Sequence, residues 1–533
     1  MRRVSPSIVA AGLLLAGLIP GGGVQAEPER EQRHVLLLSV DGLHASDLQQ
    51  WIATQPDSHL ARLARQGTTF TNAHTSEPSD SFPGLLAQVT GGTPKTTGVF
   101  YDDSYDRSMW APGSNCQGPA GTETVYAENL DRTDAAGNIP LFTSIDPAKL
   151  PLGMSGGTCQ PIFPHSFLKT NTIFNVAHAA GLYTAWSDKH PAYEIVRGPA
   201  NTGADDLFTP EINNVNDPTA ISVQATDAYD QLKVRAVLNE IDGRTADGRR
   251  RAPVPAIFGM NFQSVSVGQK LVDPLKSCQR NPGPSCDPNY VPGGYEPGSL
   301  AFTPQMRTAM RYVDGAIGSL VDELRERDLL GSTELIISAK HGQSPIDPAR
   351  LAKIGDQVSS VLAKAGVTIA QNTTDDIALV WLADQQQTNA AVAALQADRR
   401  GANTARIQFV LAGDPLADQF GDPHANTRTP DLIVQPIPGT IYTTSKAKVA
   451  EHGGFSADDT HVALLVVGPR RREDDDPSAR AENEAGAARR IDEAVHTTQI
   501  APTILDFLGL DPDALQSVRA EHTRVLPSLD RDH

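Results

Sequence analysis

The chain has 533 residues, of which 39% are hydrophobic, 5% aromatic and 20% charged, enough for one large α/β domain with insertions or for two to three domains. Its formal net charge is −18, which argues against nucleic acid as the main partner because phosphate backbones require a basic surface. A small anionic substrate is still compatible, since it responds to the local field of its site.

The N-terminus has the pattern of an export signal. An arginine pair precedes the apolar stretch SIVAAGLLLAGLIPGG, and the residues that end at Ala26 fit a small-x-small cleavage site. The alternative, an uncleaved membrane anchor, is disfavoured because the apolar run is short and broken by Pro20 and several glycines. We therefore expect residues 1–26 to be a signal peptide and residues 27–533 to form a secreted or periplasmic protein that is not held at a membrane.

Four cysteines suit an exported protein. Cys278 and Cys286 lie eight apart in a Pro/Gly-rich stretch, so a local disulfide is expected there, and it would leave Cys116 to pair with Cys159. The alternative, a metal site built from four cysteines, needs close paired spacings that are absent.

Strand-like and helical segments alternate after the signal. Continuous apolar runs predict buried strands at HVLLLSV, LYTAWSD, PAIFGMNF and STELIISAKHG. Helical patterns cover 46–67, GLLAQVTGG, FLKTNTIFNVAHAAG, 219–245, the amphipathic stretch that starts at PQMRTAM, and finally IDEAVHTTQIAPTILDFLGL. This alternation predicts an α/β fold with three layers, α/β/α, around a mostly parallel central sheet.

Two segments read as insertions into this pattern. Residues 104–170 are polar, rich in glycine and proline, and carry two cysteines, so we expect them to lie over the site. Residues 350–440 are expected to form an inserted cap or subdomain with two helices and short strands.

Four polar residues stand where strand-like runs end or loops begin, namely Asp41, Ser81, His341 and His452. Open α/β sheets place their chemistry just past the carboxyl ends of the strands. A carboxylate, a hydroxyl and two imidazoles are the parts of a metal-assisted nucleophilic site. Ser81 precedes a predicted helix and is the candidate nucleophile; the alternative is that it, or one of the two residues before it, is only an N-cap.

These residues lie in motifs of a recognisable order. VDGLH is followed by SDSFPGLLAQVTGGTPKTTGVFYD, SAKHGQ, EHGGF and HTTQIAPTILDFLGL. Together the motifs resemble the alkaline phosphatase superfamily, in its type I phosphodiesterase/nucleotide pyrophosphatase branch, over most of the mature chain. The resemblance implies an alkaline phosphatase-like fold and an exported hydrolase of phosphate esters that forms a covalent phosphoserine at Ser81. It places Asp41 and His341 on the metal that activates Ser81, and His452 on a second metal.

The sequence departs from that family at several places. Lys340 stands where the family has Asp, and the family's Asp-x-x-Gly-His is matched only by Val265 and Gln269. Gly84 stands where Asn is common. With these changes the second metal keeps only one ligand, His452, whereas zinc normally takes three or four protein ligands. We therefore expect one divalent ion, zinc, bound by Asp41, Ser81 and His341.

Lys340 is then expected to replace part of the lost positive charge or to act as a catalytic base. The alternative is that it forms a structural salt bridge in an inactive site. There are three further candidate site residues, namely Asp188, His190 and Gln269. The first two are chosen because an Asp-Lys-His triple ends a predicted strand, and Gln269 because it matches a ligand position of the family motif.

Three functions are compatible with this sequence. The first is hydrolysis of a small anionic phosphate ester, without nucleic acid or a membrane as partner. The second is binding by a catalytically decayed member of the superfamily. The third, a sulfatase-like esterase, is disfavoured because the segment that begins at Ser81 lacks the arginine of Ser-x-Pro-x-Arg.

Overall fold

The structure, a computed structural model, describes residues 32–214, 222–271, 293–445, 448–469 and 488–529. The predicted signal peptide, residues 1–26, and the predicted Cys278–Cys286 disulfide lie outside the described residues. Within these ranges, no helix combines the length and the apolar character needed to cross a membrane.

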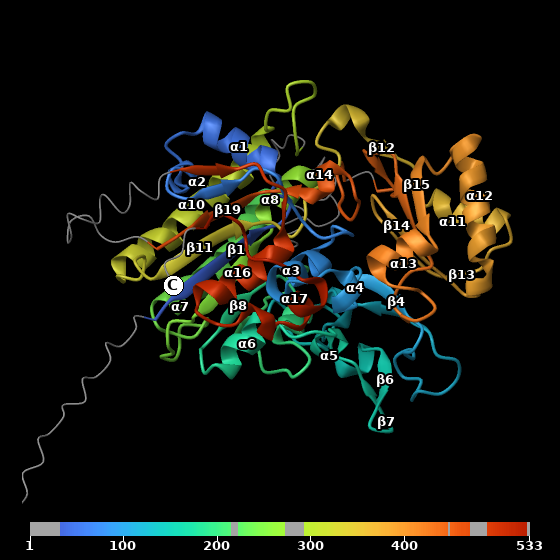
Figure 1. The fold of residues 1–533 in the computed structure, drawn as a ribbon, viewed down its shortest axis with the longest axis horizontal. Coiled ribbons are helices and arrows are strands. Elements are labelled where there is room, and N and C mark those ends of the chain that lie inside the picture. The colour runs from blue at the N-terminus through green and yellow to red at the C-terminus, as the bar shows by residue number, and fades with distance from the viewer. Residues whose placement is uncertain (1–31, 215–221, 272–292, 446–447, 470–487, 530–533) are drawn as a thin grey trace, which may run out of the picture. The chain divides into compact units, whose positions relative to one another are not determined.

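An eight-stranded sheet forms the centre of the described chain, with the order β20-β2-β19-β11-β1-β10-β8-β9. In that order the strands are Arg489–Ile491, Thr68–Phe70, Leu464–Val467, Thr333–Ser338, His34–Val40, Ile257–Phe262, Ala185–Ser187 and Asp206–Phe208. Figure 1 labels β19, β11, β1 and β8 among these strands. Only β19 is antiparallel to its neighbours, β11 and β2, while the other pairs of this sheet are parallel. The predicted mostly parallel sheet is confirmed.

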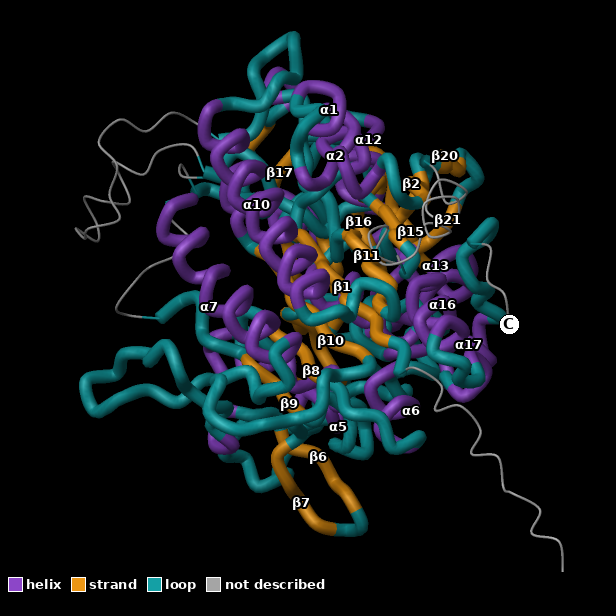
Figure 2. Tube along the Cα trace, turned by 90° about the vertical axis from the view of Figure 1, so that its left-hand side faces the viewer, coloured by secondary structure: helices purple, strands orange, loops and turns teal. Residues whose placement is uncertain are grey.

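Helices cover both faces of this sheet, as Figure 2 shows for α7 and α10 on one side and α6, α16 and α17 on the other. Successive side chains of β1 point to opposite faces of the sheet, which explains why a helical layer packs on each face. Leu36 and Leu38 belong to one hydrophobic cluster, and Val35 and Leu37 belong to the other. The first cluster includes residues of α1 (Ala45–Thr54), α2 (His59–Ala64), α7 (Val223–Ile241), α8 (Ser264–Lys270) and α10 (Pro304–Glu326). The second includes residues of α3 (Ser81–Thr90), α6 (Ile173–Ala179), α16 (Ile500–Phe507) and α17 (Gln516–Glu521). The three-layer prediction is therefore confirmed.

The single helix predicted over 46–67 is wrong, because the structure has two helices there, α1 and α2. Pro56 disfavours the helical conformation of Gln55, whose φ is −130°. Ser58 then starts α2, since its side chain accepts a hydrogen bond from the backbone N–H of Ala61. A helical hydrophobic period continues across the break, which is why periodicity alone did not reveal it.

A second, antiparallel sheet lies in the chain between β11 and β19, with the order β13-β14-β16-β15. Its strands are Ile369–Thr374, Ala378–Leu382, Leu432–Pro436 and Ile407–Ala412. Helices α11 (Gln357–Lys364) and α12 (Thr388–Arg400) share a hydrophobic cluster with one face. The other face packs with α13 (Asp414–Phe420) and with Phe100 and Tyr101, which follow α3 and the short α4 (Pro94–Thr97). The structure thus adds a third helix to the two predicted between 350 and 440.

Two hairpins lie in the segment 104–170 and its border. They are β4–β5 (Asp103–Asp106 with Thr122–Val125) and β6–β7 (Leu152–Ser155 with Thr158–Pro161), and α5 (Pro164–Phe167) follows. Cys116, between β4 and β5, forms a disulfide with Cys159 of β7 across a sequence separation of 43. The predicted Cys116–Cys159 pairing is confirmed.

Candidate active site

The ends of four neighbouring parallel strands supply most of the site. Asp41 directly follows β1, Gln263 directly follows β10, Asp188 directly follows β8, and Lys340 comes two residues after β11. These strands are adjacent in the order β11-β1-β10-β8, so their carboxyl ends meet at one edge of the sheet.

Ser81 is the first residue of α3. Asp80 is the N-cap, since its Oδ2 accepts from the backbone N–H of Phe82 at 2.9 Å. Of the three residues that the sequence offered as a cap, Asp80 is therefore confirmed, and Ser81 does not cap the helix. The Ser81 Oγ instead lies 3.1 Å from Nε2 of His341 and 3.1 Å from Nζ of Lys189. The hydroxyl is thereby placed between a basic nitrogen and a cation.

His341 is oriented by its own backbone neighbour. Its Nδ1 lies 2.8 Å from the carbonyl oxygen of Gly342, which only accepts, so Nδ1 carries the proton and Nε2 is left to accept from the Ser81 hydroxyl. The ring of His452 lies beside it, with the ring centroids 3.9 Å apart. Burial lowers the pKa of His341 and holds the pKa of His452 well below its usual value. His341 is therefore a neutral base in contact with the candidate nucleophile.

Lys189, which the sequence analysis placed between two candidates but did not assign, reaches the centre of the site. Its Nζ lies 3.2 Å from Oδ2 of Asp41 and 3.1 Å from Oγ of Ser81. Burial works to lower the pKa of Lys189, but the carboxylates of Asp41, Asp188 and Asp80 raise it. This lysine is thus a partly buried ammonium that bridges the carboxylate and the hydroxyl.

Gln263 is the second residue that sequence reasoning missed. Its Nε2 donates to Oδ2 of Asp41, the oxygen that Lys189 also contacts. The family motif pointed two residues further along, to Val265, which is buried in the hydrophobic core. The signal that identifies Gln263 is its place immediately after β10 at the shared strand edge.

Lys340 lies beside the site but pairs with Asp188. Its Nζ is 3.1 Å from Oδ1 and 3.0 Å from Oδ2 of that carboxylate, and it lies 4.2 Å from the centre of the Tyr193 ring. Burial lowers the pKa of Lys340, opposed by Asp188 and Asp41. The structure brings Asp188 into the site through this ion pair, and the ammonium that contacts Ser81 is that of Lys189.

The other candidates do not contact Ser81. His190 pairs through Nδ1 with Glu211 at 2.8 Å. Gln269 donates to the carbonyl of Gly42 at 2.7 Å and to the hydroxyl of Tyr295 at 3.0 Å. Both are therefore supporting residues around the strand edge in this arrangement.

Asp41 is fully buried and is the anion around which the site is built. Burial alone would raise its pKa, but the ammonium groups of Lys340 and Lys189 hold it well below its usual value. Nε2 of His341 lies 3.7 Å from Oδ2 of Asp41. The carboxylate is consequently ionised, and its Oδ2 accepts from Lys189 and Gln263.

The expected metal ligands, Asp41, Ser81 and His341, do not fit a divalent ion in this arrangement. Oδ2 of Asp41 already accepts from Lys189 and Gln263, and Ser81 is contacted by an ammonium. Among the described residues, Oδ1 of Asp41, Oδ1 of Asp80 and Nδ1 of His452 have no hydrogen-bond partner, and the last two atoms lie 3.8 Å apart. Of the three expected ligands only Asp41 keeps such a free oxygen, which falls short of the three or four ligands that zinc takes. In the described residues, no group of three or more His, Cys, Asp or Glu side chains is arranged to hold a metal.

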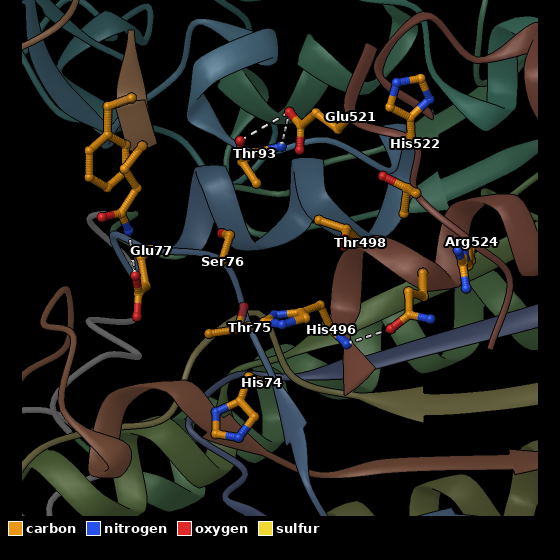
Figure 3. A pocket seen from close by; sticks show the side chains of 14 residues that line it. His74, Thr75, Ser76, Glu77, Thr93, His496, Thr498, Glu521, His522 and Arg524 are labelled. Atoms are coloured by element: carbon orange, nitrogen blue, oxygen red, sulfur yellow. Dashed lines mark hydrogen bonds between the residues drawn. The ribbon is translucent and has the colours of Figure 1, made fainter. Parts of the chain in front are cut away.

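A separate cavity of about 530 Å³ opens elsewhere in the described chain (Figure 3). It is lined by His74, Ser76, His496 and Arg524 among others, and by Glu521, which accepts from the backbone N–H of Thr93 at 2.9 Å. None of the residues that contact Ser81 lines it. The cavity is thus distinct from the strand-edge site.

Comparison with known proteins identifies related sequences and folds. The family described as Type I phosphodiesterase / nucleotide pyrophosphatase matches residues 35–133 and 277–458, together more than half of the chain. The structure of murine ectonucleotide pyrophosphatase / phosphodiesterase 5 is similar, with a TM-score of 0.54 and 15% identity over 90% of this chain and 96% of that one. An inactive form of the murine protein in complex with AMP is similar at 14% identity over 90% of this chain and 96% of that one, with a TM-score of 0.54. The human protein is similar at 14% identity over 90% and 95% of the two chains, with a TM-score of 0.52. At these identities the structural likeness concerns the fold.

One curated relative matches over a shorter stretch. The tRNA modification GTPase MnmE of Methylobacterium sp. (strain 4-46) is 32% identical over 191 residues, which span 36% of this chain and 37% of that protein. This chain contains no Gly-Lys pair anywhere in its sequence, and therefore no phosphate loop of the G-x-x-x-x-G-K-[ST] type. The match to MnmE carries no further argument about the strand-edge site.

Proposed function

Since this chain belongs to the type I phosphodiesterase / nucleotide pyrophosphatase family, we propose that it hydrolyses phosphate esters through a covalent phosphoserine at Ser81. The observation that carries the proposal is the position of the Ser81 Oγ, 3.1 Å from both His341 Nε2 and Lys189 Nζ. A hydroxyl in contact with a base and a cation is the arrangement of an activated nucleophile.

The reaction has two steps, and both use Ser81 as the nucleophile or leaving group and His341 as the proton carrier. In the first, the Ser81 hydroxyl gives its proton to His341 Nε2, Oγ bonds to phosphorus, and the bond from phosphorus to the leaving oxygen breaks. The leaving oxygen takes the proton from His341. In the second step water gives a proton to His341 and bonds to phosphorus, the bond from phosphorus to Oγ breaks, and the proton returns to Ser81.

The substrate that we propose is a small anionic ester, such as an ester of a nucleoside 5′-phosphate. The Lys189 ammonium and the N-terminal end of α3 both attract a phosphoryl group. The murine phosphodiesterase 5 structure with AMP supports a nucleotide as a suitable test substrate.

Members of this family typically depend on divalent zinc. The sequence predicts a single zinc ion on Asp41, Ser81 and His341, but Lys189 and Gln263 contact these residues where the ion would bind, so the three do not fit it in this arrangement. We include no step through a metal in the reaction above, because Lys189 and Gln263 occupy the side of Asp41 that would face it.

The first prediction concerns Ser81 and His341. Ser81→Ala should lower the turnover of the p-nitrophenyl ester of thymidine 5′-phosphate by about 10³-fold or more, and His341→Ala by about 10²–10⁴-fold. Mass spectrometry of acid-quenched wild type should find one phosphoryl group on the peptide that contains Ser81. The matched control is Ser58→Ala, which removes the N-cap of another helix, α2, and should leave turnover unchanged.

Two results would contradict the proposal. Full turnover by Ser81→Ala would exclude the serine as nucleophile. No turnover of phosphate mono- or diesters by wild type, with binding of AMP retained, would favour the catalytically decayed binding protein.

We also propose that the chain is exported after cleavage behind Ala26. The Cys116–Cys159 disulfide supports an oxidising compartment, where such bonds form and persist. N-terminal sequencing of protein recovered from the medium or periplasm should begin at Glu27; an intact N-terminus in the cytoplasm would contradict export.

A further inference from the structure

We propose that the ammonium of Lys189 takes the place of a metal ion beside Ser81, so that phosphoryl transfer in this chain needs no divalent metal. The inference rests on the proposed function, because it concerns how the same nucleophile is activated. It departs from the zinc dependence that is typical of the family.

The position of Nζ is the first argument. A metal that activates a serine must contact both the serine oxygen and an anionic ligand, and Lys189 Nζ makes these two contacts, at 3.1 Å to Ser81 and 3.2 Å to Asp41. Its third N–H has only Oε1 of Gln263, 3.5 Å away, among the described residues. That N–H is therefore available to an oxygen of the phosphoryl group.

The second argument is that Lys189 is held in place. Its backbone N–H donates to Oδ1 of Asp188 at 2.9 Å, and its carbonyl accepts from Ile212 at 3.0 Å. Asp188 is itself fixed by Lys340, at 3.0 and 3.1 Å, and by Nε1 of Trp186 at 3.2 Å. Lys340 thus acts as a positioning residue for the segment that carries Lys189.

Charge is the third argument. Asp41 and Asp188 are each paired with an ammonium group, that of Lys189 and that of Lys340 respectively. A divalent ion bound to Asp41 would place two positive charges beside the ammonium of Lys189, which already pairs with that carboxylate. Desolvated charges of one sign at contact distance repel strongly, so the lysine and the metal exclude one another.

The chemistry balances without an added reagent. As Oγ of Ser81 bonds to phosphorus and the bond to the leaving oxygen breaks, the proton of Ser81 passes to His341. Lys189 keeps its three protons throughout and donates hydrogen bonds to Oγ and to a phosphoryl oxygen, where negative charge develops.

The decisive test measures zinc binding and does not depend on turnover. Wild type and Lys189→Ala, both dialysed against EDTA and then against buffer, are titrated with zinc by calorimetry. We expect no stoichiometric binding to the Ser81 site of wild type and a gain of at least about tenfold in affinity in Lys189→Ala, because the competing ammonium is gone. Ser81→Ala/Lys189→Ala should lose part of that gain, which locates the new site.

Turnover supplies the second arm. Dialysis against EDTA should leave wild-type turnover of the thymidine ester unchanged, and Lys189→Met should lower it by about 10²–10³-fold. Methylammonium should restore part of the activity of Lys189→Gly, and the exposed control Lys364→Met should behave as wild type.

The outcomes separate the two proposals. Stoichiometric zinc in wild type, or turnover that is lost on EDTA treatment and restored by zinc, would overturn the role of Lys189. Absence of all turnover in wild type would count against the proposed hydrolysis, while the zinc titration would still decide whether the lysine occupies the metal position.

Discussion

Two lysines of the strand edge divide the work between them. Lys189 faces the nucleophile, whereas Lys340 is fully buried and makes its ion pair with Asp188. A buried carboxylate that loses its only ammonium partner retains the full cost of its desolvation. The stability of the loop that carries Lys189 should therefore depend on Lys340.

Lys340→Met should lower the free energy of unfolding by about 3–5 kcal/mol, because it leaves Asp188 buried and unpaired. The double variant Lys340→Met/Asp188→Asn should regain most of this loss, since the uncompensated charge is removed. Urea unfolding followed by circular dichroism measures both, with the exposed Lys353→Met expected within about 0.5 kcal/mol of wild type. A double variant as unstable as the single one would show that the ion pair is not the cause.

At the level of single residues, the sequence allowed prediction of the anion Asp41 and the nucleophile Ser81 but not of the cation Lys189. Asp41, Ser81 and His341 could be found because each ends a strand or starts a helix and each matches a family motif. Lys189 matches no motif, and its reach to Ser81 depends on the order in which β8, β10 and β1 lie side by side. That order is a property of the sheet and is not written in any one segment.

At the level of secondary-structure elements, the contact between α3 and the end of β11 sets the positions of Ser81 and His341. A Cβ atom on Gly84 would collide with the backbone carbonyl of Lys340, so the helix approaches the strand end more closely than any other residue would allow. Ser81 begins α3 and His341 follows Lys340, so this approach sets the distance between nucleophile and base. The departure from the family at Gly84 thereby has a structural reason.

Gly84→Ala should push α3 away from β11. We expect a loss of about 1–3 kcal/mol in unfolding free energy from overpacking, together with a fall in turnover of up to about 10²-fold as the Ser81–His341 distance grows. Thermal unfolding and the thymidine ester assay measure the two effects. The matched control is Gly315→Ala in α10, whose added Cβ meets nothing within 4 Å and should stabilise the helix by about 0.5–1 kcal/mol. Equal effects at both glycines would contradict the close-approach argument.

The types and order of the longest elements, such as β1, α7 and α10, followed from hydrophobic patterning, whereas the bounds of the helices predicted over 46–67, 167–181 and 491–510 did not. The main example is the interruption between α1 and α2, where Pro56 and the Ser58 cap override a helical pattern that runs through them. Such interruptions depend on backbone conformations and hydrogen bonds that a count of apolar positions does not contain.

On the scale of the whole described chain, the four-stranded sheet touches the loop that carries His452. Tyr101 donates to Oδ2 of Asp375 at 2.8 Å and to the carbonyl of His452 at 3.0 Å, which links the turn between β13 and β14 to the site. Asp376, the next residue, lies against Asp459, and both side chains are buried. The contact between the four-stranded sheet and the segment that follows His452 therefore contains a pair of buried carboxyl groups, those of Asp376 and Asp459.

This pair predicts that stability falls as the pH rises. Burial raises the pKa of Asp459 to about 7, and burial together with Asp459 raises the pKa of Asp376 well above its usual value. Folded-state pKa values above those of the unfolded chain mean that the folded chain binds more protons, so the stabilisation is complete below the unfolded pKa and is lost as the pH rises through about 7. Asp376→Asn, which cannot ionise, should flatten the decline in melting temperature between about pH 5.5 and 8.5. The exposed Asp322→Asn should keep the wild-type slope, and an unchanged slope in Asp376→Asn would exclude the carboxyl pair as its origin.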